Sequence, residues 1–129
     1  MEKMKRVLLF DNDEEVLDVM KEALNYEGFD VCGISETDDI FTVIADYQPD
    51  LVILDYLLTG INGGEICHQI KTSQKTAGLP VMLISAYPKV LLSLGDYGCD
   101  DFIPKPFDLT DLINRIQKLT MKPVDTEAG

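Results

Sequence analysis

The stretch PDLVILDYLLTGINGGEI, residues 49–66, passes abruptly from an apolar run to polar residues and glycines. Its apolar part, Leu51–Leu54, is continuous rather than alternating, which is typical of a strand buried on both faces of a parallel sheet. Two further runs, Val7–Phe10 and Val81–Ile84, have the same length and similar branching. Together the three runs predict the centre of a parallel sheet.

Helical patterns lie between and after these runs. Four segments repeat apolar residues at three-to-four spacing, which indicates amphipathic helices. The repeats are Val16, Val19, Met20, Ala23 and Leu24; Ile40, Val43, Ile44 and Tyr47; Ile66, Cys67 and Ile70; and Leu109, Leu112, Ile113, Ile116 and Leu119. Asp13 and Asp108 can cap the first and last helices, and Gly28 can close the first. Lys89–Leu94 is expected to form a short additional helix.

Two less apolar segments, Asp30–Ile34 and Asp101–Pro104, complete an alternation of five strands and five helices. This order predicts an α/β fold with a doubly wound sheet. The 129-residue chain has the usual length of one domain, which we expect over residues 1–120. Residues 121–129 are expected to form a flexible tail or a truncated linker.

Charge and cysteine content narrow the function classes. The chain has 23 carboxylates against 11 Lys and Arg, a formal net charge of -12, which argues against direct binding to nucleic acid or an anionic membrane. The first apolar run is too short for a signal peptide or a membrane span. The cysteines are odd in number and widely spaced, so we expect reduced core residues in a cytoplasmic protein: Cys32, Cys67 and Cys99.

Four reactive side chains follow the strand runs: Asp11, Asp55, Ser85 and Lys105. Ligands of open α/β sheets bind beyond the carboxyl ends of the strands, so these side chains are expected to converge. Carboxylates there can hold Mg²⁺, and a carboxylate can also attack a phosphoryl group while a lysine neutralises charge on its oxygens. Ser85 can donate a hydrogen bond to the same group. The pattern predicts a phospho-acceptor site centred on Asp55.

Four stretches resemble the landmark segments of bacterial two-component receiver domains, the chemotaxis-regulator-like single-domain type included. They are VLLFDND (7–13), the opening stretch (49–66), PVMLISAY (80–87) and GCDDFIPKPFDLTDLINRI (98–116). The resemblance runs from Val7 to about Leu119. It implies a flavodoxin-like parallel sheet in the order 2-1-3-4-5, flanked by five helices.

The resemblance also implies roles for individual residues. By position these are Asp55 as phospho-acceptor, Asp11 as an acid of the metal pocket, Ser85 as switch hydroxyl, Lys105 as phosphate partner and the Leu57 carbonyl as a metal ligand. A cis bond before Pro106 is implied as well. The implied cofactor is Mg²⁺, and the implied phosphoryl donor is a sensor histidine kinase or a phosphotransfer protein. The implied downstream target is another protein. Enzyme activity is expected to be limited to self-phosphorylation and autodephosphorylation.

Two positions depart from the family pattern. Asn12 stands where the family usually has a second acid, and it can offer only one neutral oxygen to a metal, so Mg²⁺ binding is expected to weaken. Phe102 stands at the position of the switch aromatic and has no hydroxyl, so any reorientation must act through packing. Both departures support an alternative function, that of a degenerate receiver that binds partners without being phosphorylated.

A second alternative is an enzyme. Asp11-Asn12-Asp13 after an apolar strand also resembles the nucleophile motif of haloacid-dehalogenase-type phosphatases, with Asp11 as nucleophile and Ser85 in their second motif. The short chain and the place of Lys105 after the Asp100-Asp101 pair weigh against this reading. A phosphoryl label found on Asp11 after incubation with a phosphate donor, together with turnover of phosphate esters, would favour the enzyme.

Overall fold

The computed structural model describes residues 4–58, 62–87 and 97–121. Within these ranges five strands alternate with four helices. The strands are β1 (Arg6–Phe10), β2 (Asp30–Ile34), β3 (Leu51–Asp55), β4 (Val81–Ser85) and β5 (Asp101–Pro104), and the helices are α1 (Glu14–Tyr26), α2 (Ile40–Tyr47), α3 (Gly63–Thr72) and α5 (Leu109–Thr120). The fifth helix expected from the sequence, Lys89–Leu94, lies outside the described residues.

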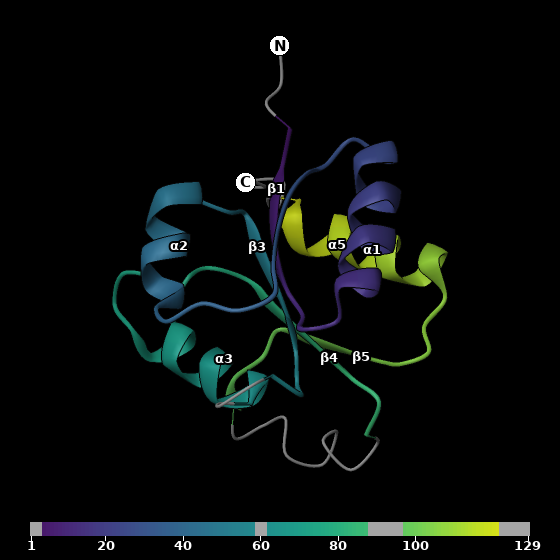
Figure 1. Ribbon diagram of the computed structural model, residues 1–129. Coiled ribbons are helices and arrows are strands. Elements are labelled where there is room, and N and C mark those ends of the chain that lie inside the picture. The colour runs from purple at the N-terminus through teal and green to yellow at the C-terminus, as the bar shows by residue number, and fades with distance from the viewer. Residues whose placement is uncertain (1–3, 59–61, 88–96, 122–129) are drawn as a thin grey trace.

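The strands form one parallel sheet in the order β2-β1-β3-β4-β5, which confirms the predicted topology. Helices α1 and α5 cover one face of the sheet, and α2 and α3 cover the other (Figure 1). Residues alternate between the two faces along β1: Val7 and Leu9 pack toward α1 and α5, and Leu8 and Phe10 pack toward α2 and α3. Burial on both faces explains why the strand runs are continuously apolar.

The helix termini follow the capping residues. The Asp13 carboxylate accepts hydrogen bonds from the first backbone N–H groups of α1, and Asp108 does the same for α5, as predicted. Asn62 caps α3, a role that the sequence analysis did not assign. Gly28 follows α1 with a positive φ of 93°, a conformation that suits glycine, so its predicted role at the helix end is confirmed.

Some side chains lie elsewhere than the helical periodicity predicted. Val19 is 58% exposed and Leu109 is 40% exposed, whereas Leu17, which was not assigned to the apolar stripe, is buried against the sheet. The prediction that all cysteines are core residues is correct for Cys67 and wrong for Cys32 and Cys99, which are only partly buried. In the described ranges, no helix is both long and apolar enough to span a bilayer.

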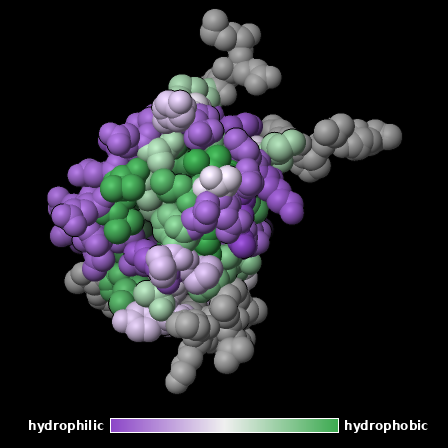
Figure 2. Space-filling view, turned by 90° about the vertical axis from the view of Figure 1, so that its right-hand side faces the viewer, coloured by the Kyte–Doolittle hydropathy of each residue, from purple (hydrophilic) through white to green (hydrophobic). Residues whose placement is uncertain are grey.

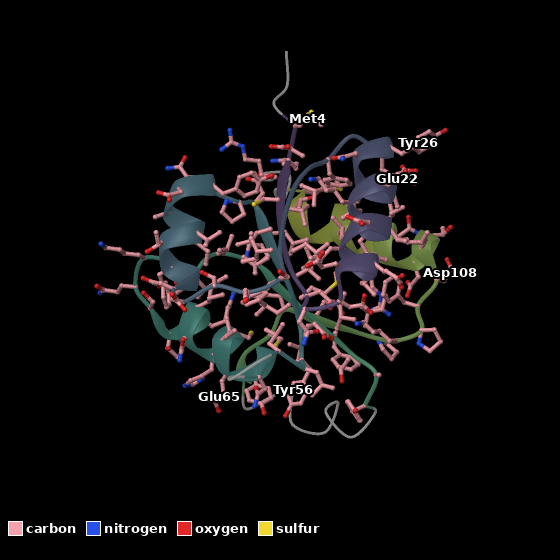
Figure 3. All side chains as sticks on the ribbon, viewed as in Figure 1. Met4, Glu22, Tyr26, Tyr56, Glu65 and Asp108 are labelled. Carbon is pink, nitrogen blue, oxygen red and sulfur yellow. The ribbon has the colours of Figure 1, made fainter. Side chains whose placement is uncertain are left out.

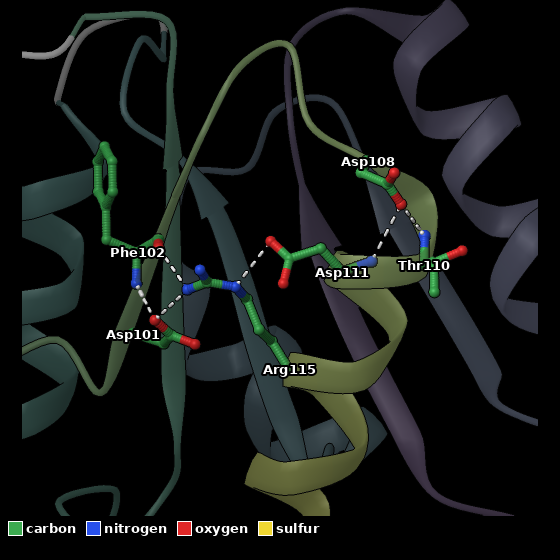
Figure 4. Close-up of polar contacts among 6 residues, drawn as sticks. All are labelled: Asp101, Phe102, Asp108, Thr110, Asp111 and Arg115. Carbon is green, nitrogen blue, oxygen red and sulfur yellow. Dashed lines mark hydrogen bonds and ion pairs between the residues drawn. The ribbon is translucent and has the colours of Figure 1, made fainter.

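Arg115 joins α5 to the edge strand β5. Its Nη1 donates to Asp101 Oδ1 at 2.8 Å and to the Phe102 carbonyl at 3.0 Å, and its Nε donates to Asp111 Oδ2 at 3.0 Å (Figure 4). Figure 4 also shows the Asp108 cap at the start of the same helix, next to the turn that leads from β5 into α5. These contacts fix both ends of the segment that carries Lys105.

Candidate functional site

The carboxyl ends of the strands bring the four predicted residues to one edge of the sheet. Asp11 directly follows β1, Asp55 and Ser85 are the last residues of β3 and β4, and Lys105 directly follows β5. The backbone N–H of Lys105 donates to the Ser85 carbonyl at 2.8 Å, which sets the two residues side by side. Figure 3 shows Tyr56, the next residue after Asp55, at the opposite end of the molecule from Met4.

Lys105 forms an ion-paired cluster with two buried carboxylates. Its Nζ lies 3.1 Å from Asp11 Oδ2 and 3.4 Å from Asp55 Oδ1. Asp11 is 1% exposed and Asp55 is 7% exposed, so both carboxylates lie almost entirely beneath the surface. The peptide bond from Lys105 to Pro106 is cis, as the family resemblance implied.

The charges of the cluster do not balance, because two carboxylates share one ammonium group. Burial and the nearby Asp11 carboxylate raise the pKa of Asp55, although Lys105 opposes the shift. Burial alone would lower the pKa of Lys105, but the carboxylates of Asp55 and Asp11 outweigh it and raise that pKa. The site therefore has surplus negative charge and a lysine that stays protonated.

Ser85 is buried next to this cluster. Its Oγ accepts a hydrogen bond from the backbone N–H of Tyr87 at 2.9 Å, and the residue is 1% exposed. Because a hydroxyl can accept and donate at once, Ser85 can still donate to a group bound at Asp55. Leu57 and Tyr87 are 50% and 51% exposed respectively, so they lie at the surface on the segments that follow β3 and β4.

Asp13 and Asn12 take different positions from Asp11. The Asp13 carboxylate caps α1, while its backbone N–H donates to Asp11 Oδ1 at 2.9 Å and so orients that carboxylate. Asn12 is exposed and lines a separate hollow of about 710 Å³ together with Glu36 and Asp38. No hydrogen bond joins the Asn12 side chain to another residue in the described part of the chain.

Gly63 brings the start of α3 against β3. Its N–H donates to the Tyr56 carbonyl at 2.8 Å, and a Cβ at this position would overlap the backbone carbonyl of Asp55. Only glycine allows this approach. The sequence analysis did not assign this contact, because a glycine that begins a helix gives no sign of what its backbone touches.

The donor set is compatible with Mg²⁺. Within the described ranges, no group of three or more His, Cys, Asp or Glu side chains is arranged to hold a metal. Mg²⁺ needs fewer protein ligands, because it commonly keeps several waters and binds through one or two carboxylates. Asp11 and Asp55 supply that pair, and their surplus negative charge is what a divalent cation would neutralise.

An apolar groove reaches the site from the side of α1. It has a volume of about 520 Å³ and joins α1 to the turn after β5; its lining includes Val16, Val19, Met20, Ala86, Lys105, Pro106 and Phe107. Figure 2 shows hydrophobic side chains gathered in a band between hydrophilic ones on the side of the molecule that carries α1 and α5. The lysine that pairs with Asp55 is thus part of the groove lining.

The family model of the response regulator receiver domain matches residues 7–117, which is most of the chain. The chain belongs to the response regulator receiver domain family. This is a signalling family of two-component systems rather than a family of classical enzymes, and its members generally bind Mg²⁺.

Curated relatives of this receiver domain include transcriptional regulators. The DNA-binding regulator RpaA of Synechocystis sp. is 29% identical over 118 residues, which cover 90% of this chain and 49% of RpaA. The DNA-binding response regulator MtrA of Mycolicibacterium smegmatis is 30% identical over 127 residues, covering 96% of this chain and 54% of MtrA. The chain thus spans about half the length of the curated relatives it matches.

Solved structures confirm the receiver fold. The response regulator TrrA of Thermotoga maritima, solved in complex with Mg²⁺ and beryllofluoride, has a TM-score of 0.81 and 28% identity, covering 90% of this chain and 99% of TrrA. A CheY-like receiver domain of Methanospirillum hungatei has a TM-score of 0.80 and 25% identity, covering 91% of this chain and 94% of its own.

Proposed function

We propose that this receiver domain accepts a phosphoryl group on Asp55 from a sensor histidine kinase or a phosphotransfer protein and thereby switches the binding of a protein partner. The observation that carries the proposal is the position of the Lys105 ammonium, 3.1 Å from Asp11 and 3.4 Å from Asp55. A buried aspartate beside a protonated lysine at the carboxyl edge of a parallel sheet is suited to phosphoryl transfer.

In this reaction an Asp55 carboxylate oxygen attacks phosphorus while the bond from phosphorus to the donor histidine nitrogen breaks. Lys105 lies where its ammonium can neutralise the phosphoryl oxygens, and it stays charged because of the two carboxylates. Ser85 then donates a hydrogen bond to a phosphoryl oxygen.

Asp11, Asp55 and the backbone carbonyl of Leu57 would hold Mg²⁺, and Asn12 would contribute through its amide oxygen or a water. When bound, Mg²⁺ supplies positive charge for the transferring phosphoryl oxygens. Asn12 is exposed and neutral, so its contribution is weaker than that of an acid. The Asp13 N–H holds Asp11 in orientation for this role.

Phosphorylation adds negative charge beside Ser85 and Lys105. This charge shifts the conformational equilibrium of the segments that follow β4 and β5 and so changes the surface offered to a partner. Phe102 is 6% exposed and packs with the α2 and α3 side of the sheet, so a change there would be transmitted through packing. The formal charge of -12 supports a protein as the immediate target rather than direct DNA contact by this domain.

The proposal is tested by incubating the protein with Mg²⁺ and a small phosphoramidate donor, followed by mass mapping of the acyl phosphate. We expect one phosphoryl group, on the peptide that contains Asp55, and none on Asp55→Asn. A phosphoryl group on Asp11 together with turnover of phosphate esters would contradict the proposal and favour a phosphatase activity. No label on any aspartate would leave a receiver that acts by binding alone.

A further inference from the structure

Two cysteine thiols lie side by side on α3 and on the segment that enters β5. Cys67 and Cys99 are 32 positions apart in the chain, yet their Sγ atoms are 3.0 Å apart. Both are free thiols. The Cys67 thiol also lies 3.6 Å from the carbonyl oxygen of Tyr97. The pair plays no part in the Asp55 site.

Contacts on both sides of the pair hold the two segments together. Positions 64, 67 and 71 share one face of α3 because they are three and four residues apart. A Cβ at Gly64 would overlap the ring of Tyr97, so the helix backbone and this ring are in direct contact. One turn after the pair, Lys71 Nζ lies 2.8 Å from Asp100 Oδ2. The close approach of the sulfur atoms is therefore built into the packing.

The two thiols have unequal environments. Cys67 is fully buried, whereas Cys99 is partly exposed. A hydrogen bond between the sulfur atoms lowers the pKa of Cys99, and the same hydrogen bond together with burial raises the pKa of Cys67. Cys99 is the more accessible of the two, so peroxide can reach its sulfur, and its thiolate is the nucleophilic form of cysteine. The buried partner keeps its proton and lies ready as the second thiol.

We propose that Cys67 and Cys99 form an oxidisable dithiol that hydrogen peroxide converts into an intramolecular disulfide. The Cys99 thiolate attacks one peroxide oxygen, the O–O bond breaks, and the departing hydroxide takes up a proton to form water, which leaves a sulfenic acid on Cys99. The Cys67 sulfur then attacks the sulfenic sulfur, an S–S bond forms, and the S–O bond breaks. The leaving hydroxide takes the Cys67 proton as a second water.

Oxidation would join α3 covalently to the segment that enters β5. A cross-link between residues so far apart in the chain restricts the unfolded state and should raise the midpoint of thermal unfolding. Disulfides of proteins in reducing compartments are usually transient and redox-sensing. The dithiol would therefore make this domain responsive to peroxide independently of phosphorylation at Asp55.

The test is a peroxide titration of the whole chain, followed by alkylation of the remaining thiols after unfolding and by non-reducing peptide mapping. We expect the 3 cysteines to fall to one free thiol, with a mass lower by two hydrogen atoms and with Cys67 and Cys99 in one linked peptide. Thermal unfolding should shift upward, and a reducing thiol should reverse the shift. The Asp55→Asn variant should give the same result.

Cys32→Ser is the matched control, because it removes the one thiol outside the pair, and it should still form the linkage. In Cys67→Ser, a sulfenic acid on Cys99 should accumulate and be trapped by a dione reagent. The proposal is overturned if the linked peptide contains Cys32, if only disulfides between two chains form, or if both thiols of the wild-type pair remain free while other residues are oxidised.

Discussion

At the residue scale, Asp55 carries a cost in stability. Burial and Asp11 raise its pKa above the ordinary 3.8, so the folded protein holds the charged form less favourably than the unfolded chain does. Below the ordinary pKa the carboxyl is neutral in both states and the cost disappears. As the pH rises through the folded pKa, the cost reaches its full size.

We therefore predict that Asp55→Asn is more stable than the wild type at neutral pH, by on the order of 1 kcal/mol. The gain should shrink as the pH falls and vanish below the ordinary aspartate pKa, as measured by urea unfolding across pH. Asp46→Asn removes an exposed carboxylate and should change stability by less than about 0.5 kcal/mol at neutral pH. Equal stability of Asp55→Asn and the wild type at neutral pH would contradict the account.

Asn12 gives a second prediction at this scale. Asn12→Asp places an anionic oxygen next to Asp11, where the wild type offers a neutral amide, so Mg²⁺ should bind about tenfold more tightly, a gain of about 1.4 kcal/mol. The measurement is the Mg²⁺ dependence of backbone amide chemical shifts. Glu22→Gln, at an exposed position of α1 outside the lining of the hollow beside Asn12, is the control. An unchanged Mg²⁺ affinity in Asn12→Asp would show that this position does not contribute to the metal pocket.

At the scale of elements, the start of α3 packs directly against the backbone at the end of β3. Gly63→Ala would press a Cβ into the backbone carbonyl of Asp55, so we predict a loss of about 1–3 kcal/mol in the free energy of unfolding. Phosphoryl acceptance should fall as well, because the same carbonyl moves with Asp55. Chemical unfolding and the phosphoramidate assay measure the two effects.

Gly78→Ala is the matched control, since a Cβ there meets no atom within 4 Å. It should be neutral or slightly stabilising because alanine restricts the unfolded chain. If the two alanine variants were equally stable, the close contact between α3 and β3 would not be a constraint on the fold.

The groove beside α1 gives a prediction about the donor. A phosphodonor protein must place its phosphohistidine at Asp55, and the groove joins exposed Val19 to Lys105. We predict that Val19→Asp slows transfer from a donor protein by at least about tenfold, through the loss of apolar contact, while labelling by the small phosphoramidate is unchanged. Tyr26→Asp, at an exposed site outside the groove lining, is the control. Equal slowing with both donors would place the effect at the site itself.

The sequence was sufficient for the elements that depend on local pattern. Continuous apolar runs predicted the buried strands, and the strand ends predicted that Asp11, Asp55, Ser85 and Lys105 converge. It could not predict contacts that depend on how a helix packs against a distant segment. The thiol pair of α3 and the contact of Gly63 with β3 are of this kind, because neither leaves a periodic signal.

At the scale of the whole molecule, a three-layered α/β/α frame holds an acidic pocket at one end of the sheet. The two cores lie on opposite faces, and the pocket lies where strands from the middle and the edge of the sheet end together (Figure 1). A phosphoryl group added at Asp55, as proposed, would lie beside Ser85 at the end of β4 and Lys105 directly after β5. One change of charge can therefore act on two strand ends and on the segments that follow them.

The central claim is that this pocket is competent to hold an aspartyl phosphate at Asp55. The most direct measurement is a titration with beryllofluoride, which mimics that group, in saturating Mg²⁺, followed by the backbone amide spectrum of the wild type and of Asp55→Asn. We predict saturable shifts in the wild type, centred on residues that follow β3, β4 and β5, and no response in Asp55→Asn. An unresponsive wild type, or equal responses in both proteins, would contradict the account.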